Sequence, residues 1–326
     1  MHRKHWIDLA KGVAILAVVL DHVLFLSSSA IPELFWKHTY FSVTWFVFLV
    51  GLTNTYELLR LSKPTPKIIF LLTLKRFARL CLLYFFISTG IYWCTNTSSG
   101  SWTSAIQQLL FFTTQPTYYF VNLLLQLYCI FPILFYGVSN AKNWKQKILL
   151  TIAVFALSYV SSLNKHILWP FSPAGNYFGG LFLAVYYLGI FIGVNKIKKT
   201  RLLKYCQLTT FIILETLFII TNARTITNIP NVFLILWSLT LLWGIYIAVT
   251  IIEWRKHFYL SSMLEFLGRN TYMIYLMHFF VIQLFLNRVR LYPIFLQYIL
   301  AFCASIVIPI LINKAIQFCI KRLSLN

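Results

Sequence analysis

Long apolar stretches alternate with short polar segments along the whole chain. Each stretch approaches the roughly 20 apolar residues that a helix needs to cross a bilayer. The pattern predicts ten transmembrane helices, with bounds at 7–28, 39–58, 78–95, 118–138, 147–163, 177–194, 204–221, 231–251, 270–287 and 291–313. Because the connections are short, we expect an all-α polytopic membrane protein in which residues 1–326 form one domain without an appended soluble module.

The positions of Lys and Arg predict which side of the membrane each connection faces. With a cytoplasmic N-terminus, 23 of the 28 Lys and Arg residues fall on the cytoplasmic side. The other five are predicted outside: Lys37, Lys165, Arg224, Arg288 and Arg290. Cytoplasmic loops characteristically carry this excess of basic residues, and an even number of helices then places both termini in the cytoplasm.

Composition supports the membrane class. Hydrophobic residues make up 60% of the 326 positions and charged residues 11%, with a mean hydropathy of +0.76. The net charge of +21 would suggest a nucleic-acid partner in a soluble protein, but here topology accounts for it and no such partner is expected. The six cysteines stand singly, without the spacing of a metal site, so no metal is expected.

The N-terminus resembles a signal peptide, because a basic start and an apolar run precede the small residues at 27–30. Asp21 and His22 interrupt that run, and many further spans follow. We therefore expect an uncleaved first helix.

The first expected helix carries ionisable residues at membrane depth. His22 follows Lys11 by eleven residues, which on a helix brings both to one face within about 20°, and Asp8 shares that face. Lys11 and His22 are then about 16 Å apart along the axis, about half the hydrocarbon thickness. A neutral imidazole can take a proton from a hydroxyl, so His22 is a candidate general base. The alternative is a histidine hydrogen-bonded within the bundle.

Two acids in the expected spans have no assigned chemistry. Asp21 points about 100° away from His22 on a helix, so the adjacent pair is not necessarily a dyad. It either orients a different group or lies near the outer interface without a chemical role. Glu215 falls in the middle of an expected span, and the sequence assigns it no specific role.

A basic cluster of Lys75, Arg76 and Arg79 stands at the expected cytoplasmic end of the third span. Arg76 and Arg79, three residues apart, share a helix face and can form a fork for phosphate groups. The excess of basic residues on the cytoplasmic side accounts for this cluster equally well.

Two further polar patterns lie within expected spans. Tyr275 and His278 are neighbours at i,i+3, and His278 is the second histidine at membrane depth. Tyr119, Asn122 and Gln126 follow a helical polar stripe. Both patterns also suit structural hydrogen bonds between helices.

These motifs, in this order, resemble the acyltransferase 3 family of integral membrane acyltransferases. The family's basic residue, ten residues and histidine in the first helix correspond to Lys11 and His22. Its Arg-x-x-Arg corresponds to Arg76 and Arg79. The resemblance covers essentially the whole chain, since it includes the aromatic fourth helix at 119–132 and the tyrosine- and histidine-containing motif at 271–278.

Three positions depart from the family pattern. The second helix reads Phe48-Leu-Val-Gly51 and lacks the family's serine before the glycine. Tyr119 and Phe120 replace a Trp-Phe pair, and an aspartate directly before the histidine of the first helix is unusual. These departures concern the donor and acceptor pocket more than membership of the family.

The resemblance implies transfer of an acyl group, most often acetyl, from cytoplasmic acyl-CoA to a hydroxyl of a surface or lipid-linked glycan. It implies activation of the hydroxyl, or carriage of the acyl group, by His22, with Lys11 and Asp8 on the same face. The phosphates of acetyl-CoA would be bound by Lys75, Arg76 and Arg79, with Lys11 as a further candidate cation at the cytoplasmic mouth. Supporting or acceptor-side roles would fall to Asp21, Tyr119, Gln126, Tyr275 and His278. The expected location is a bacterial plasma membrane, with the lipid bilayer as a further partner.

Two other classes stay open from the sequence. A transporter of polysaccharide or lipid-linked sugar would need helices broken near the midplane, and its candidate breaks are Gly51, Gly179, Gly180, Gly189 and Gly193. A member that binds sugar or CoA without turnover is suggested by the missing serine before Gly51. Transfer from acyl-CoA would separate the enzyme from both.

The predicted topology can be tested with single cysteines in a chain whose own cysteines have been replaced. A cysteine beside Lys165 should react with a membrane-impermeant maleimide on intact cells, because that segment is predicted outside. A cysteine beside Lys142 should react only after permeabilisation. The reverse pattern would overturn the topology.

Overall fold

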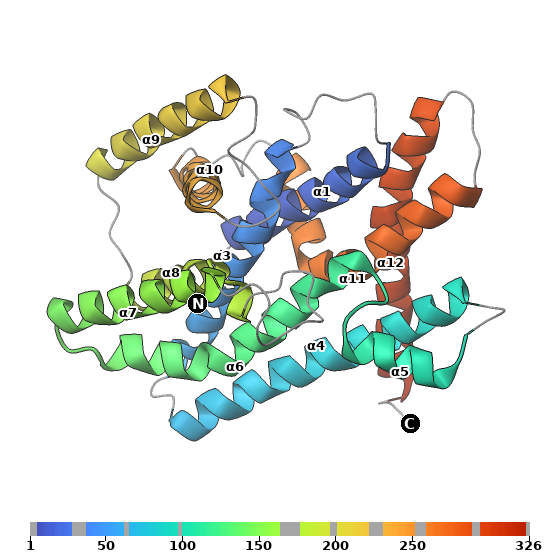
Figure 1. The fold of residues 1–326 in the computed structure, drawn as a ribbon, viewed down its shortest axis with the longest axis horizontal. Coiled ribbons are helices and arrows are strands. Elements are labelled where there is room, and N and C mark those ends of the chain that lie inside the picture. The colour runs from blue at the N-terminus through green and yellow to red at the C-terminus, as the bar shows by residue number, and fades with distance from the viewer. Residues whose placement is uncertain are drawn as a thin grey trace. The chain divides into compact units, whose positions relative to one another are not determined.

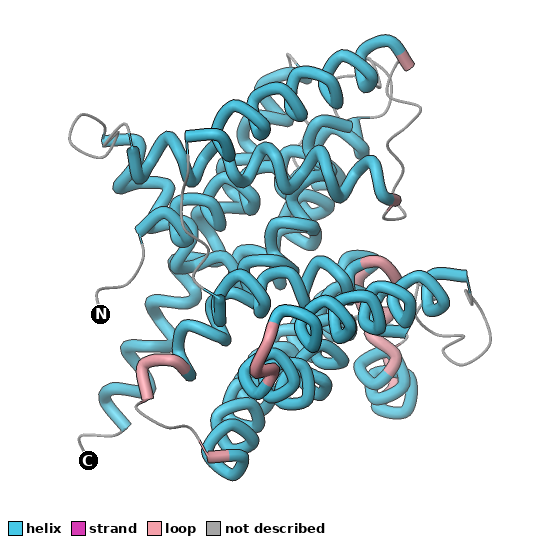
Figure 2. Tube along the Cα trace, turned by 90° about the vertical axis from the view of Figure 1, so that its left-hand side faces the viewer, coloured by secondary structure: helices cyan, strands magenta, loops and turns pink. Residues whose placement is uncertain are grey.

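The computed structural model describes residues 5–27, 37–61, 65–96, 100–163, 177–195, 201–221, 231–251, 259–288 and 294–323. Over these residues the chain is helical, with short loops and no strands (Figure 2). Three of the basic residues predicted outside, Lys165, Arg224 and Arg290, lie outside the described part. The chain divides into two compact units, of which the first holds residues 44–206 and 227–236 and the second 2–43, 207–226 and 237–326.

The first unit contains α3 (Phe41–Leu58, from Thr44 on), α4 (Pro66–Thr95), α5 (Trp102–Leu110), α6 (Tyr119–Asn140), α7 (Trp144–Leu163) and α8 (Phe182–Asn195). Helix α6 packs against α4, α7 and α8, and the short α5 packs on α4 (Figure 1). The core between these helices is rich in aromatic side chains, and Tyr84, Phe131 and Tyr186 are fully buried in it.

The second unit contains α1 (His5–Ser27), the 3₁₀ turn η1 (Lys37–Tyr40), α11 (Tyr259–Arg288) and α12 (Ile294–Leu323). It also includes α9 (Arg201–Ile220) from Gln207 on and α10 (Val232–Ile251) from Trp237 on. Helix α11 packs along both α1 and α12, and η1 packs on α1. The α1–α11 pair therefore has the most extensive helix–helix contact of this unit.

Each of the ten expected spans overlaps a helix in the described part of the chain, although α8, which overlaps the span expected at 177–194, has only 14 residues. Five helical segments are both long and apolar enough to cross a membrane, at 5–26, 116–140, 144–163, 232–249 and 295–319. These segments support a multi-pass membrane protein. The count of ten crossings and the cytoplasmic location of both termini stay predictions.

Several helices are longer than the expected spans. Helix α4 begins at Pro66 rather than near residue 78, because the Thr65 hydroxyl accepts a hydrogen bond from the Ile68 amide at 3.3 Å and caps the first turn. Arg76 and Arg79 therefore lie well inside α4 and not at its first turn. Helices α11 and α12 also extend past their expected bounds, and α5 forms where an outer loop was expected.

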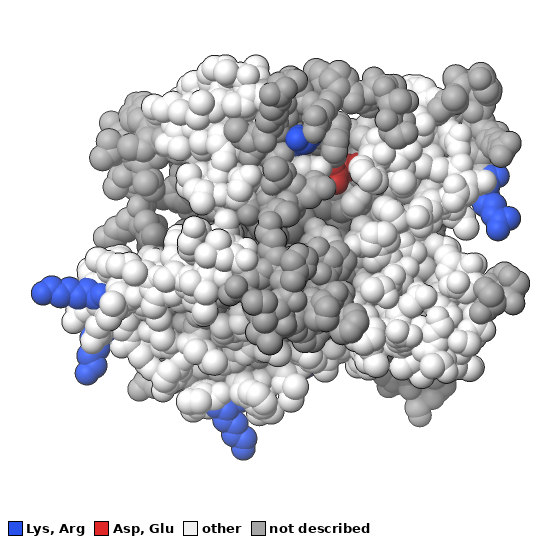
Figure 3. Space-filling model, viewed as in Figure 1, with Lys and Arg blue, Asp and Glu red and all other residues white. Residues whose placement is uncertain are grey.

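Large apolar side chains cover the outward faces of many helices. Leu82 on α4 is 72% exposed, Phe86 is 68% exposed, and Leu149 on α7 is 69% exposed. On the face drawn in Figure 3, a few scattered Lys and Arg side chains and one small acidic patch interrupt a described surface that is otherwise uncharged. Such a surface is costly in water and suits contact with lipid.

Helices α1 and α11 approach each other closely enough that their backbones touch. A Cβ atom on Gly268 would lie 1.8 Å from the backbone oxygen of Asp8. A Cβ atom on Gly12 would lie 2.0 Å from the backbone oxygen of Leu264. Small residues allow this kind of close packing in membrane helices, where burial from water does not drive helix association. The two glycines therefore set the distance between α1 and α11.

Helices α3 and α8 of the first unit cross in the same way. A Cβ atom on Gly51 would lie 2.4 Å from the backbone oxygen of Tyr186, and one on Gly189 would lie 2.2 Å from that of Phe48. Gly51, Gly189 and Gly193 all lie inside continuous helices. These glycines therefore serve helix packing and are not the midplane helix breaks that the transporter interpretation needs.

The α1–α11 contact predicts a large stability difference between two glycine substitutions. Gly268→Ala should destabilise the purified protein by about 1–3 kcal/mol or more, because the added methyl group overpacks a backbone contact. Gly90→Ala is the matched control, since nothing lies within 4 Å of a Cβ atom there. The control should be neutral or stabilising by about 0.5–1 kcal/mol through helix propensity. Equal thermal stability of the two variants in detergent would contradict the close crossing.

Candidate active site

The α1–α11 crossing brings two histidines together. The imidazole rings of His22 and His278 are stacked, with centroids 5.1 Å apart and planes 30° from parallel. Phe279 packs edge-on against His22, with ring centroids 5.3 Å apart. His278 is fully buried, whereas 23% of the His22 side chain is exposed. The pair therefore consists of one enclosed imidazole and one that is partly accessible.

The hydrogen bonding of His278 defines its tautomer. Its Nδ1 donates to the backbone carbonyl of Tyr275 at 2.7 Å, which is the i,i+3 relation of these residues on α11. In a neutral imidazole Nε2 then has no proton and is an acceptor. Within the described part of the chain this buried Nε2 has no hydrogen-bond partner. A buried acceptor of this kind is costly unless it serves a ligand or a proton transfer.

Asp21 lies beside the histidine pair but is held by another group. Its Oδ1 accepts a hydrogen bond of 2.9 Å from the Thr39 hydroxyl on η1. Its Oδ2 lies 3.9 Å from Nδ1 of His22, within ion-pair range but longer than a hydrogen bond. The carboxylate can therefore stabilise a positive charge on His22 while Thr39 fixes its orientation.

Lys11 and Asp8 share α1 with His22 but do not lie close to it. At 1.5 Å per residue they are about 16 Å and about 21 Å from His22 along the axis. Asp8 is buried against Gly268 at the helix crossing. At this end of α1, Nδ1 of His5 also bonds Oε2 of Glu265 on α11 at 3.0 Å, a contact that sequence reasoning missed.

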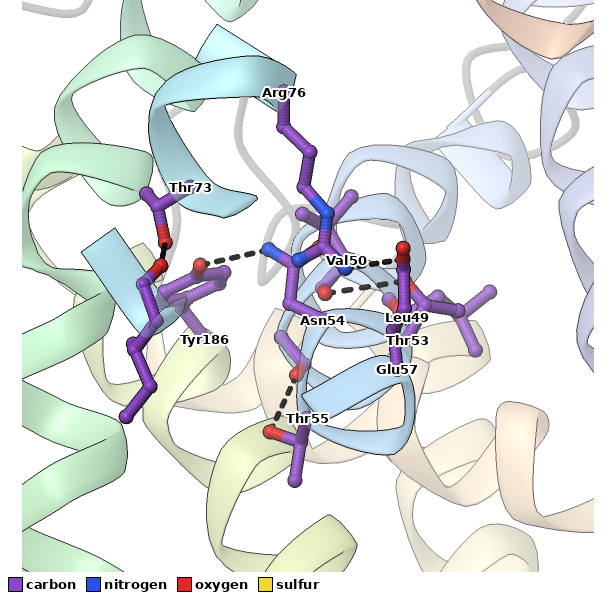
Figure 4. A network of polar contacts seen from close by, with 11 residues as sticks. Leu49, Val50, Thr53, Asn54, Thr55, Glu57, Thr73, Arg76 and Tyr186 are labelled. Atoms are coloured by element: carbon purple, nitrogen blue, oxygen red, sulfur yellow. Dashed lines mark hydrogen bonds and ion pairs between the residues drawn. The ribbon is translucent and has the colours of Figure 1, made fainter. Parts of the chain in front are cut away.

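The basic cluster on α4 has one member engaged with an acid. The Arg76 guanidinium pairs with the carboxylate of Glu57 on α3 (Figure 4). Within this pair the Arg76 side chain is 16% exposed and the Glu57 side chain is 56% exposed. Lys75 and Arg79 are both exposed. A phosphate that binds Arg76 must therefore compete with Glu57.

Figure 4 also shows the polar groups around this ion pair. The Asn54 amide donates to the Tyr186 hydroxyl at 3.2 Å, in a buried contact between α3 and α8. The hydroxyls of Thr53, Thr55 and Thr73 bond backbone carbonyls of their own helices. The threonines are thus satisfied locally, and the contacts that join different helices are Asn54–Tyr186 and the ion pair.

The polar stripe on α6 is largely structural. Oε1 of Gln126 accepts the backbone amide of Phe178 at 2.8 Å, and its amide nitrogen donates to Asn122 at 3.1 Å. Phe178 adopts a left-handed conformation with φ 51°, so the glutamine stabilises a strained turn before α8. Tyr119, at the start of α6, is half-buried. The structure favours the interhelical interpretation of Gln126.

One polar cluster in the second unit was not predicted. The Glu215 carboxylate on α9 bonds both His38 on η1 and the indole of Trp237 on α10. The signal in the sequence was an acid in the middle of an apolar helix, but periodicity could not identify its partners. Among the described residues, no group of three or more His, Cys, Asp or Glu side chains is arranged to hold a metal ion.

The model of a protein family described as an acyltransferase domain matches residues 4–314, which is nearly the whole chain. Comparisons with curated proteins and with solved structures found no match.

Proposed function

The chain belongs to the acyltransferase 3 family, and we propose that it moves an acetyl group from cytoplasmic acetyl-CoA to a hydroxyl of an extracytoplasmic or lipid-linked glycan. Membership of the family and the apolar helices make it a multi-pass membrane acyltransferase. The donor, the acceptor, the plasma-membrane location and the bacterial source belong to the proposal.

The stacked pair of His22 and His278 is the observation that carries this proposal. Acyl transfer to a hydroxyl needs a base that is neutral before the reaction and can hold a proton during it. His22 is partly accessible, and Asp21 lies within ion-pair range to stabilise the imidazolium. The buried Nε2 of His278 supplies an acceptor that the fold leaves without a partner among the described residues.

In the direct route, His22 takes the proton of the acceptor hydroxyl as its oxygen attacks the thioester carbonyl. The tetrahedral intermediate then collapses, the carbon–sulfur bond breaks, and the CoA thiolate receives a proton from His22. In the alternative route, a nitrogen of His22 attacks the thioester carbonyl, the carbon–sulfur bond breaks and CoA leaves as its thiolate. The acceptor hydroxyl then attacks the acyl group on His22, the carbon–nitrogen bond breaks, and the hydroxyl proton neutralises the CoA thiolate. Both routes use the same residue. Rapid quenching with labelled acyl-CoA in the absence of acceptor separates them, because only the second labels the protein.

Arg76, Arg79 and Lys75 are proposed to bind the phosphates of the donor, since a guanidinium fork suits phosphate oxygens. Lys11 is about 16 Å along the helix from His22, so we assign it to donor phosphate rather than to the proton transfer. Asp8, buried at the helix crossing, supports α1 at the same end.

The role of the histidine pair predicts the effect of two substitutions on label transfer from acetyl-CoA to membrane glycan. His22→Ala should lower the rate about 10²- to 10⁴-fold, the usual contribution of a general base. His278→Phe keeps an aromatic ring against His22 but removes Nε2, and it should also lose most of the transfer. Thr89→Val serves as the control, because its exposed hydroxyl bonds only its own helix.

Normal membrane insertion of each variant is required for this comparison. Activity of His22→Ala at the control level would remove His22 from the mechanism. Activity of His278→Phe at the control level would reduce His278 to a packing residue.

Because Arg76 on α4 pairs with Glu57 on α3, substitutions of these two residues should change the KM for acetyl-CoA in opposite directions. Arg76→Ala should raise the KM for acetyl-CoA about 10- to 100-fold, the range expected for a lost charge-assisted hydrogen bond. Glu57→Gln should lower it about 1.5- to 5-fold, because a partly exposed carboxylate no longer competes for Arg76. In the Arg76→Ala background, Glu57→Gln should have no effect. A rise in KM for Glu57→Gln alone would contradict phosphate binding at Arg76.

A further inference from the structure

Glu215 lies at the centre of a polar cluster that the proposed chemistry does not use. Its Oε1 bonds Nε2 of His38 at 3.0 Å, and its Oε2 accepts the indole hydrogen of Trp237 at 2.7 Å. The three residues come from α9, η1 and α10. Both carboxylate oxygens are therefore engaged, and one side chain joins three separate elements.

Aromatic rings pack around this carboxylate. Phe218 and Trp237 stack with centroids 5.5 Å apart, and both are buried. The His38 ring packs edge-on against Phe218 at 4.3 Å. A carboxylate in such surroundings is costly to maintain, so a role is the default interpretation. The directed bonds to His38 and Trp237 indicate that this role is to hold η1 in place.

The residue after His38 connects this cluster to the candidate base. Thr39 is buried, and its hydroxyl donates to Oδ1 of Asp21 at 2.9 Å. Oδ2 of Asp21 lies 3.9 Å from Nδ1 of His22. Because His38 and Thr39 are adjacent in one short 3₁₀ turn, a shift of His38 moves the hydroxyl that orients Asp21.

We propose that Glu215 is a positioning residue for His22: it anchors η1 through His38, so that Thr39 holds the Asp21 carboxylate beside the imidazole. The predicted effect of Glu215 on catalysis rests on the proposed function. The predicted effect of Glu215 on the surroundings of His22 does not depend on which reaction the protein catalyses. Loss of the anchor should weaken stabilisation of the imidazolium and leave donor binding intact.

The kinetic test compares Glu215→Gln with Thr216→Val, whose exposed hydroxyl bonds only Ile212 of its own helix. Glu215→Gln should lower kcat about tenfold and leave the KM for acetyl-CoA unchanged, while Thr216→Val should match wild type. Thr39→Val should lower kcat similarly, and the double variant should be no worse than either single one, because both break the same connection. Equal kcat for Glu215→Gln and Thr216→Val, or fully additive losses, would overturn the proposal.

A labelling test needs no activity, so it remains informative if the donor is not acetyl-CoA, and its Thr39→Val arm covers the case in which Glu215→Gln folds poorly. His22→Cys is introduced into a chain without its own cysteines, and the rate of its reaction with a small maleimide is measured. The measurement is repeated after Glu215→Gln or Thr39→Val is added to the same chain. Both substitutions should change the rate at least threefold, and Thr216→Val should not. Unchanged rates would overturn the positioning role. Changed rates with no acyl transfer by wild type would refute the proposed function while supporting the geometric relay.

Discussion

The close crossing of α1 and α11 is the contact on which the candidate active site depends. Gly12 and Gly268 allow the two backbones to touch, and this distance lets a ring on α1 stack on a ring of α11. A side chain at either glycine would push the helices apart and separate His22 from His278. The packing of this helix pair and the proposed chemistry thus depend on the same contact.

Much of the helical architecture was predictable, and the contacts between helices were not. Runs of about 20 apolar residues identify helices directly, and Lys11, His22, Arg76 and Arg79 carry a recognisable family pattern. The start of α4 was missed because the cap at Thr65 lies far outside the apolar stretch. The pairing of His22 with His278 could not be predicted, since periodicity gives the face of a helix but not its neighbour.

Charged side chains in the two units follow one rule. Glu57, Glu215 and Glu265 each bond a basic or imidazole side chain on another element. For Glu215, which falls in the middle of an expected span, such a partner offsets the cost of an ionisable group at membrane depth. These contacts differ in solvent exposure, and therefore in how easily a ligand could replace the partner. The half-exposed Glu57 can be displaced from Arg76 by an anionic ligand, whereas Glu215 has both oxygens bonded and anchors η1.

The most direct test of this account is disulfide formation between His22→Cys and His278→Cys in a chain lacking its six native cysteines. The matched control pairs His22→Cys with Leu284→Cys, six residues further along α11 at an exposed position. The account predicts rapid cross-linking of the first pair in native membranes and none of the second. Failure of the first pair to cross-link, or equal cross-linking of both, would contradict the stacked histidine pair.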